Sequence, residues 1–145
     1  MKDKTVQIGS MELKFLVDEN DGRGDLVMFE FLVPPNARVP APHYHRDVDE
    51  AVYGLEGTLA TIVDGRTHEV RKGDTVFIPR GSVHHHENPH SEPARALIVL
   101  TPGSIGRRYF EEIAEAVNVP ERPDLEKIDA IMRHHGLIPA DHPTP

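Results

Sequence analysis

The sequence has no cysteine among its 145 residues. Without cysteine there can be no disulfide framework, no thiolate nucleophile, and no zinc–thiolate or iron–sulfur site. Any metal ligands must therefore be nitrogen and oxygen atoms. The absence of cysteine also fits a reducing compartment, and we expect the protein to be cytoplasmic.

Positive charge and long apolar runs are also scarce. The 16 Lys and Arg against 24 Asp and Glu give a formal net charge of −8, and no basic cluster could follow a phosphate backbone. No stretch approaches the roughly 20 apolar residues that span a bilayer, and the first residues lack the apolar region of a signal peptide. We expect no nucleic-acid or membrane partner, and a small molecule as the substrate.

What is present between residues 5 and 100 is a series of short segments rich in Val, Ile, Phe and Leu, separated by Gly, Pro, Asp and Asn. This rhythm is typical of antiparallel strands, which at this spacing close into a barrel or a sandwich. The predicted strands lie near residues 5–8, 12–17, 26–33, 44–46, 50–57, 59–65, 66–70, 75–79, 83–88 and 94–100. The fold class is therefore all-β.

The pattern changes after residue 103. Apolar residues at helical spacing predict two amphipathic helices, over 107–117 and 123–136, the second ending at a glycine. We divide the chain into a barrel at 1–103, a helical extension of the same domain at 104–138, and a loosely ordered proline-rich tail at 139–145.

Two histidines and a glutamate crowd the segment 42–57, PHYHRDVDEAVYGLEG. In an extended segment His43 and His45 point to the same face, because side chains alternate with period two. A four-residue hairpin loop at 46–49 places His45 opposite Glu50 across two antiparallel strands. This geometry predicts that all three side chains share one surface.

A fourth candidate ligand lies in the segment 73–88, GDTVFIPRGSVHHHEN, where His84 begins a strand. Three imidazoles and one carboxylate can hold one divalent transition metal (Fe, Mn, Ni, Cu or Zn) and leave two positions of an octahedron open. Gly54 shares the parity of Glu50, so it is expected to leave space beside the metal. The alternative is a zinc ion held tetrahedrally by all four groups, a closed site that only braces the barrel.

The two segments together resemble the two motifs of the cupin family. The first motif, HxH, four residues, E, six residues, G, is matched by His43, His45, Glu50 and Gly57, and the second by Gly73, Pro79, Gly81, His84 and Asn88. Ala37 stands where the family often has a glycine that opens the first motif. The resemblance covers mainly residues 34–100. It implies a double-stranded β-helix (jelly-roll) barrel with a metal near its mouth, bound by His43, His45, Glu50 and His84.

The resemblance defines the site better than the reaction, because cupins include dioxygenases, isomerases, decarboxylases, hydrolases and binding domains. The overall pattern, including the region from Pro102, resembles small cupins related to flavonol (quercetin) dioxygenases. We predict a metal-dependent dioxygenase in which Glu50 accepts the substrate proton. The alternatives are a non-redox isomerase or lyase, and a non-catalytic domain that binds a small molecule or a metal. Small cupins are often homodimers, and we expect one here.

We also predict the roles of four other side chains in or near the two motifs, from the strand face on which each lies and from its residue type. His86 shares the parity of His84 and is either a hydrogen-bond or acid–base partner beside the site or a solvated strand residue. Asn88 is predicted to fix a turn by bonding to the backbone. Tyr53 and Phe77 are predicted to be core residues rather than a platform for the substrate.

Overall fold

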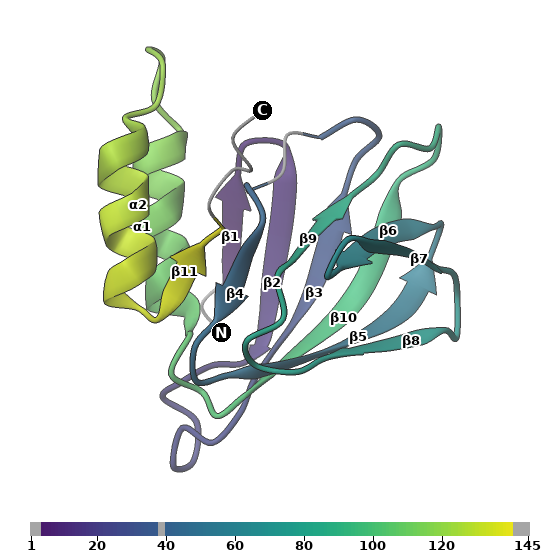
Figure 1. Cartoon of the computed structure of the whole chain (residues 1–145), viewed down its shortest axis with the longest axis horizontal. Coiled ribbons are helices and arrows are strands. Elements are labelled where there is room, and N and C mark those ends of the chain that lie inside the picture. Colours follow the sequence, from purple (N-terminus) through teal and green to yellow (C-terminus); the bar gives the residue numbers. More distant parts are fainter. Residues whose placement is uncertain (1–3, 38–39, 141–145) are drawn as a thin grey trace.

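The computed structural model describes residues 4–37 and 40–140, which form two facing antiparallel sheets and a helical pair (Figure 1). One sheet has six strands in the order β1-β2-β3-β10-β5-β8, and the other has five in the order β11-β4-β9-β6-β7. The strands are β1 (Thr5–Ile8), β2 (Met11–Val17), β3 (Val27–Val33), β4 (His43–His45), β5 (Asp49–Glu56), β6 (Leu59–Val63), β7 (Arg66–Val70), β8 (Thr75–Ile78), β9 (His84–Glu87), β10 (Ala94–Thr101) and β11 (Leu137–Pro139).

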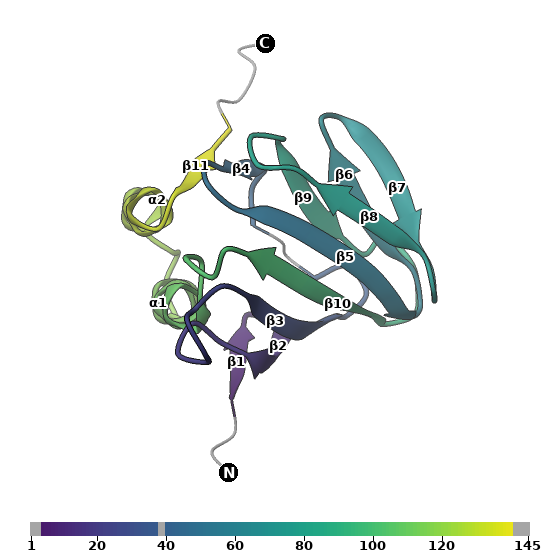
Figure 2. The ribbon, with the colours of Figure 1, turned by 90° about the horizontal axis from the view of Figure 1, so that it is seen from below.

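The core fills the space between the two sheets (Figure 2). Side chains alternate across each strand, and in β3 and β10 every second residue is buried while its neighbours are half-buried or exposed. The inward set of these two strands is Val27, Phe29, Phe31, Val33, Ala94, Ala96, Ile98 and Leu100. The predicted all-β barrel is confirmed.

The hairpin loop predicted at 46–49 is wrong. β4 pairs with β9 and β11, whereas β5 pairs with β10 and β8, so the chain crosses from one sheet to the other at this point. Val48 lies in the crossing and is buried in the core. Burying this apolar side chain between the sheets favours a crossover rather than a solvent-exposed hairpin turn.

Two helices follow the barrel, as predicted: α1 (Arg107–Val117) and α2 (Leu125–His134). They pack against each other at one end of the barrel, with α1 beside β1 and α2 beside β11 (Figures 1 and 2). β11 then pairs with β4, with Leu137 opposite His45. Part of the predicted tail, residues 141–145, lies outside the described residues.

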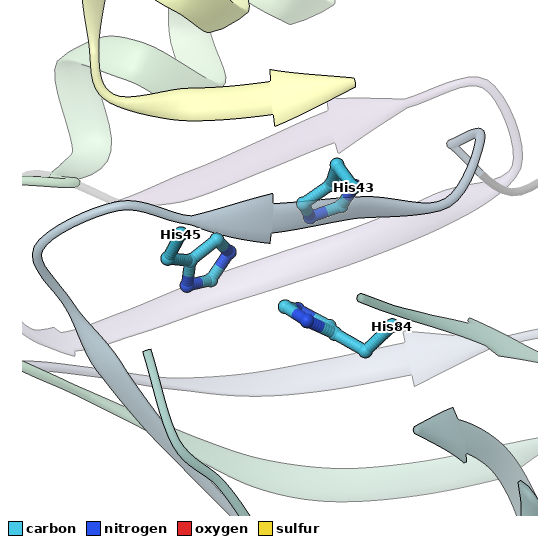
Figure 3. Close-up of side chains that lie close together, drawn as sticks. All are labelled: His43, His45 and His84. Atoms are coloured by element: carbon cyan, nitrogen blue, oxygen red, sulfur yellow. The ribbon is translucent and has the colours of Figure 1, made fainter. Parts of the chain in front are cut away.

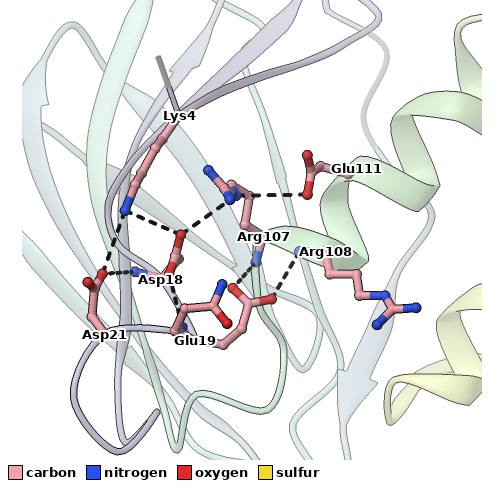
Figure 4. A network of polar contacts seen from close by, with 8 residues as sticks. Lys4, Asp18, Glu19, Asp21, Arg107, Arg108 and Glu111 are labelled. Carbon is pink, nitrogen blue, oxygen red and sulfur yellow. Dashed lines mark hydrogen bonds and ion pairs between the residues drawn. The ribbon is translucent and has the colours of Figure 1, made fainter. Parts of the chain in front are cut away.

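Polar contacts fasten the start of α1 to the loop after β2 (Figure 4). The carboxylate of Glu19 accepts the backbone N–H groups of Arg107 at 2.9 Å and Arg108 at 3.1 Å. These are unpaired donors at the positive end of the helix dipole, so a carboxylate there is stabilising. The buried Asp18 adds ion pairs with Lys4 at 3.4 Å and with Arg107 at 3.6 Å.

Tyr53 and Phe77 are not core residues, so that prediction is wrong. They are 44 % and 62 % exposed. Glu50 and Val52 occupy the inward positions of β5, so the alternation of the strand turns Tyr53 to the outer face. In the described part of the chain, neither helix is long and apolar enough to cross a membrane.

Candidate metal centre

Three histidines meet on neighbouring strands of the five-stranded sheet. His43 in β4 lies directly opposite His84 in β9, and His45 follows two residues further along β4. The ring centroids are 4.7 to 5.3 Å apart, and one nitrogen of each ring lies within 4.8 Å of the others (Figure 3). This cluster could bind a metal ion through imidazole nitrogens.

Backbone carbonyls orient two of the three rings. Nδ1 of His43 donates to the carbonyl of Ala41 at 2.9 Å, and Nδ1 of His84 donates to that of Ser82 at 3.0 Å. A carbonyl only accepts, so both rings carry a proton on Nδ1 and leave Nε2 as the nitrogen for a metal. In contrast, Nδ1 of His45 is buried and has no hydrogen-bond partner among the described residues.

Burial keeps His43 and His45 in the neutral form. It lowers the pKa of His43 to about 3 and that of His45 to about 4, and the neighbouring His84 adds to both effects. Both imidazoles are therefore neutral rather than cationic at neutral pH. This is the form that binds metal ions.

Glu50 approaches the three histidines from the opposite sheet. Its Oε1 lies 3.5 Å from Nε2 of His84 and 3.9 Å from Nε2 of His45. Its Oε2 accepts a hydrogen bond from Nε2 of His86 at 2.8 Å, and the other nitrogen of His86 bonds to the Thr61 hydroxyl at 2.9 Å. One carboxylate oxygen thus faces the cluster while the other is held by the His86–Thr61 pair.

The Glu50 carboxyl is ionised although it is buried. Burial raises its pKa, but the contacts with His84 and His86 outweigh burial and hold the pKa of Glu50 well below its usual range. The pKa of His84 is raised, because its contact with Glu50 outweighs the opposite effect of burial. The carboxylate therefore requires a positive charge beside it, which a proton on His84 or a divalent cation can supply.

These donors fit a divalent transition metal. The 3.5 and 3.9 Å separations from Oε1 of Glu50 to the two imidazole nitrogens are close to the spacing of about 3 to 3.5 Å between donors that each lie about 2.1 Å from one ion. His43, His45 and His84 would hold the ion, and Glu50 as the fourth ligand stays a prediction.

Three other predicted residues have different outcomes. His86 is a partner of Glu50 rather than a solvated residue. Asn88 fixes a turn as predicted, because its amide donates to the carbonyls of Val33 and Glu92. The prediction for Gly54 is wrong: a Cβ there would lie 2.0 Å from the carbonyl oxygen of Arg71, so the glycine permits backbone contact and leaves no space beside the histidines.

A cavity of about 80 Å³ adjoins the cluster, and its remaining walls are apolar. The barrel contributes Ile8, Met11, Leu13, Phe29, Phe31, Ile98 and Leu100, and the C-terminal extension contributes Tyr109, Phe110, Ile113 and Leu137. Sequence reasoning missed this second group as lining residues. The helical spacing of Tyr109, Phe110 and Ile113 indicated an apolar face, but no local pattern shows which surface such a face covers.

The two-sheet barrel and the three histidines on its neighbouring strands β4 and β9 define the class of the protein: a small β-barrel with a candidate metal centre. The cupin domain model matches residues 29–100, and the polyketide cyclase RemF of Streptomyces resistomycificus is 32 % identical, with 69 % of this chain and 74 % of RemF covered and a TM-score of 0.59. The chain belongs to the cupin superfamily.

Two further relatives are similar over shorter regions. The tetracenomycin polyketide synthase protein TcmJ of Streptomyces glaucescens is 33 % identical over 60 residues, which is 41 % of this chain and 40 % of TcmJ. A cupin-superfamily sugar phosphate isomerase from Silicibacter pomeroyi is 28 % identical, with 63 % of this chain and 59 % of that one covered and a TM-score of 0.55. The chain thus spans less than two thirds of the length of either protein.

Proposed function

We propose that this chain is a metal-dependent cupin enzyme that transfers a proton on a small, mainly apolar organic molecule, as isomerases, lyases and cyclases do. The observation that carries this proposal is the Glu50–His86–Thr61 chain of hydrogen bonds, which ends beside the three histidines. A carboxylate buried next to a Lewis-acid site and connected to an imidazole is suited to general acid–base work.

Each residue has a distinct part in this chemistry. When bound, a divalent ion would polarise a substrate oxygen and acidify the neighbouring C–H group. Glu50 accepts the proton, because its carboxylate is ionised and faces the cavity region. His86 holds Oε2 of Glu50 in place, and Thr61 in turn orients His86. The apolar walls keep water away from the reacting carbon.

The relatives support non-redox chemistry over the predicted dioxygenase. RemF is a polyketide cyclase, and the Silicibacter protein is a sugar phosphate isomerase. Dioxygenase chemistry is the second candidate, because three imidazoles beside a carboxylate also suit redox-active iron, manganese, nickel or copper. The likeness to flavonol dioxygenases stays a prediction.

The test is proton exchange on acetoin, a six-heavy-atom enolisable ketone, in D2O under anaerobic conditions. NMR would follow loss of the C–H signal with protein loaded with zinc or manganese. We expect exchange above that of the metal-free protein, and a fall of at least about 100-fold in Glu50→Gln. Glu87→Gln, an outward change on β9, is the matched control and should leave the rate unchanged.

Two results would contradict the proposal. Loaded protein that exchanges no faster than metal-free protein would exclude proton transfer at this site. Conversion of acetoin or a phenol that occurs only with dioxygen, with oxygen consumed in step, would replace the proposal with the dioxygenase. Metal analysis of each variant beforehand separates a lost base from a lost ion.

A further inference from the structure

Tyr109 is distinctive among the residues that line the cavity. The described lining consists of the His and Glu side chains, apolar side chains, and this one phenol, which comes from α1 rather than from the cupin motifs. Tyr109 is 5 % exposed, and its hydroxyl forms no hydrogen bond with another described residue. The hydroxyl itself retains some accessible surface, so it can donate a hydrogen bond to a molecule that enters the cavity.

The fold holds Tyr109 at a fixed place in the wall. Glu19 binds the first N–H groups of α1, two and one residues before Tyr109. At the other end of the helix, the Asn118 side chain accepts from the N–H of Gly9 at 2.8 Å and donates to the carbonyl of Gln7 at 2.7 Å. Both ends of α1 are therefore tied to the N-terminal part of the barrel, and the phenol is preorganised.

The ionisation state of Tyr109 makes it a donor. Burial raises the pKa of its hydroxyl above its usual value, so the phenol keeps its proton at neutral pH. The ring of Tyr109 contacts Phe110 at 4.9 Å and His135 at 5.2 Å between ring centroids, and Phe110 in turn contacts Phe29 at 5.3 Å. These edge-to-face contacts hold the phenol ring in place.

The cavity also limits the size of that ligand. At about 10 to 15 Å³ for each water-sized site, a cavity of about 80 Å³ holds roughly five to eight non-hydrogen atoms. This is the scale of a single ring.

We infer that Tyr109 is a substrate-binding residue, and that the substrate is a one-ring or similarly small molecule with two oxygen functions, one at the histidines and the other at the Tyr109 hydroxyl. The inference rests on the proposed function, because it places the first oxygen at the metal centre. The inference is carried by the Tyr109 hydroxyl, which has no hydrogen-bond partner among the described residues, by the mainly apolar lining that it shares with the histidines, and by the cavity size.

The test compares two probes that differ by one oxygen. Phenol has seven non-hydrogen atoms, and hydroquinone adds a hydroxyl on the far side of the ring. Dissociation constants would be measured by calorimetry with zinc-loaded, oxygen-free protein. Wild-type protein should bind hydroquinone about 3- to 10-fold more tightly than phenol, the range of one neutral hydrogen bond. Tyr109→Phe should reduce hydroquinone affinity to that of phenol and leave phenol affinity unchanged.

The controls separate recognition from structure. Tyr53→Phe removes the same atom from an exposed position on the outer face and should change neither constant. Zinc content and thermal stability of Tyr109→Phe should match the wild type. The inference would be overturned if Tyr109→Phe kept its higher affinity for hydroquinone. It would also be overturned if wild-type protein bound neither phenol nor hydroquinone. Because binding requires no turnover, a failure in the acetoin assay would count against the proposed function alone.

Discussion

The cavity has two walls of opposite character. The histidine wall (His43, His45, Glu50 and His84) is polar, comes from the cupin motifs and is built on facing sheets. The helical wall (Tyr109, Phe110, Ile113 and Leu137) is almost entirely apolar and comes from the C-terminal extension. The first wall is suited to chemistry and the second to selecting what reaches it. In the proposed function, the cupin motifs would supply the metal donors and the helical wall would select the substrate.

The two walls are nevertheless joined through the shortest strands of the barrel. β4 carries two of the histidines and has only three residues, and it is paired by β9 on one side and β11 on the other. Additional backbone bonds join Arg46 to Gly136 at 2.9 Å and Ala140 to Pro42 at 2.9 Å. The C-terminal segment thus supports the strand on which the metal donors lie.

The largest expected effect is the loss of zinc affinity in His45→Ala, which alters the histidine wall and leaves the helical wall unchanged. Removing one of three imidazoles should lower zinc affinity by at least about 100-fold, since even loss of a residue that only supports a ligand costs about 10- to 100-fold. The barrel should remain folded, because its core is apolar. Competition titration and circular dichroism would measure the two effects, with His68→Ala on β7 as the control. Stoichiometric zinc retained in His45→Ala would contradict the assignment.

Leu137→Ala should affect both walls. Leu137 is 2 % exposed and pairs with His45, so its truncation should cost about 2 to 5 kcal/mol of unfolding free energy. It should also weaken zinc binding, because β4 loses part of its support. Urea unfolding and zinc titration would test this, with the half-buried neighbour Ile138→Ala as control. Unchanged zinc affinity in a destabilised Leu137→Ala would show that the walls are independent.

Glu19→Ala should loosen the helical wall alone. Loss of its bonds to the two N–H groups at the start of α1 should cost about 0.5 to 2 kcal/mol of unfolding free energy. Zinc affinity should not change, because Glu19 does not contact the histidine wall. Glu115→Ala, at an exposed position on the same helix, should have little effect on either quantity. A drop in zinc affinity in Glu19→Ala would show that α1 positions the metal donors.

The smallest expected effect is a pH dependence at Asp18. Burial raises its pKa, but the bond from Asn20 and the charges of Lys4 and Arg107 outweigh burial, so the folded-state pKa is below the usual value. The unfolded chain therefore binds the proton more readily, and the stability due to Asp18 is present at neutral pH and is lost as pH falls through the folded-state pKa. Asp18→Asn should cost about 0.2 to 1 kcal/mol at pH 7, and this difference should shrink in acid. A difference independent of pH would exclude the charge as its cause.

The periodic parts of the fold could be predicted from the sequence, as could the residues that meet at the site. Alternating apolar residues marked the long strands, as in β3 and β10, and the spacing from Tyr109 to Val117 marked α1. The four side chains of the histidine wall lie close together as predicted, but the hairpin that was predicted to bring Glu50 beside His45 is wrong. Local spacing at 46–49 is compatible with both a hairpin and a crossover between sheets, and burial of Val48, a long-range effect, decides between them.

The helical wall could not be predicted because its contacts are all distant in the sequence. β11 is three residues long and is stable only through its pairing with β4, some 90 residues earlier, so 137–139 resembled the start of a loose tail. The place of Tyr109 in the cavity depends on Glu19, at the opposite end of the chain. The homodimer and the domain boundary at residue 103 stay predictions.

The most direct test of the central claim is zinc titration of wild-type protein followed by X-ray absorption spectroscopy of the loaded form. We predict one ion per chain, surrounded only by nitrogen and oxygen, with three imidazoles among its ligands. Absence of stoichiometric binding, or an ion bound with fewer than three imidazoles, would contradict the claim that His43, His45 and His84 form one metal centre.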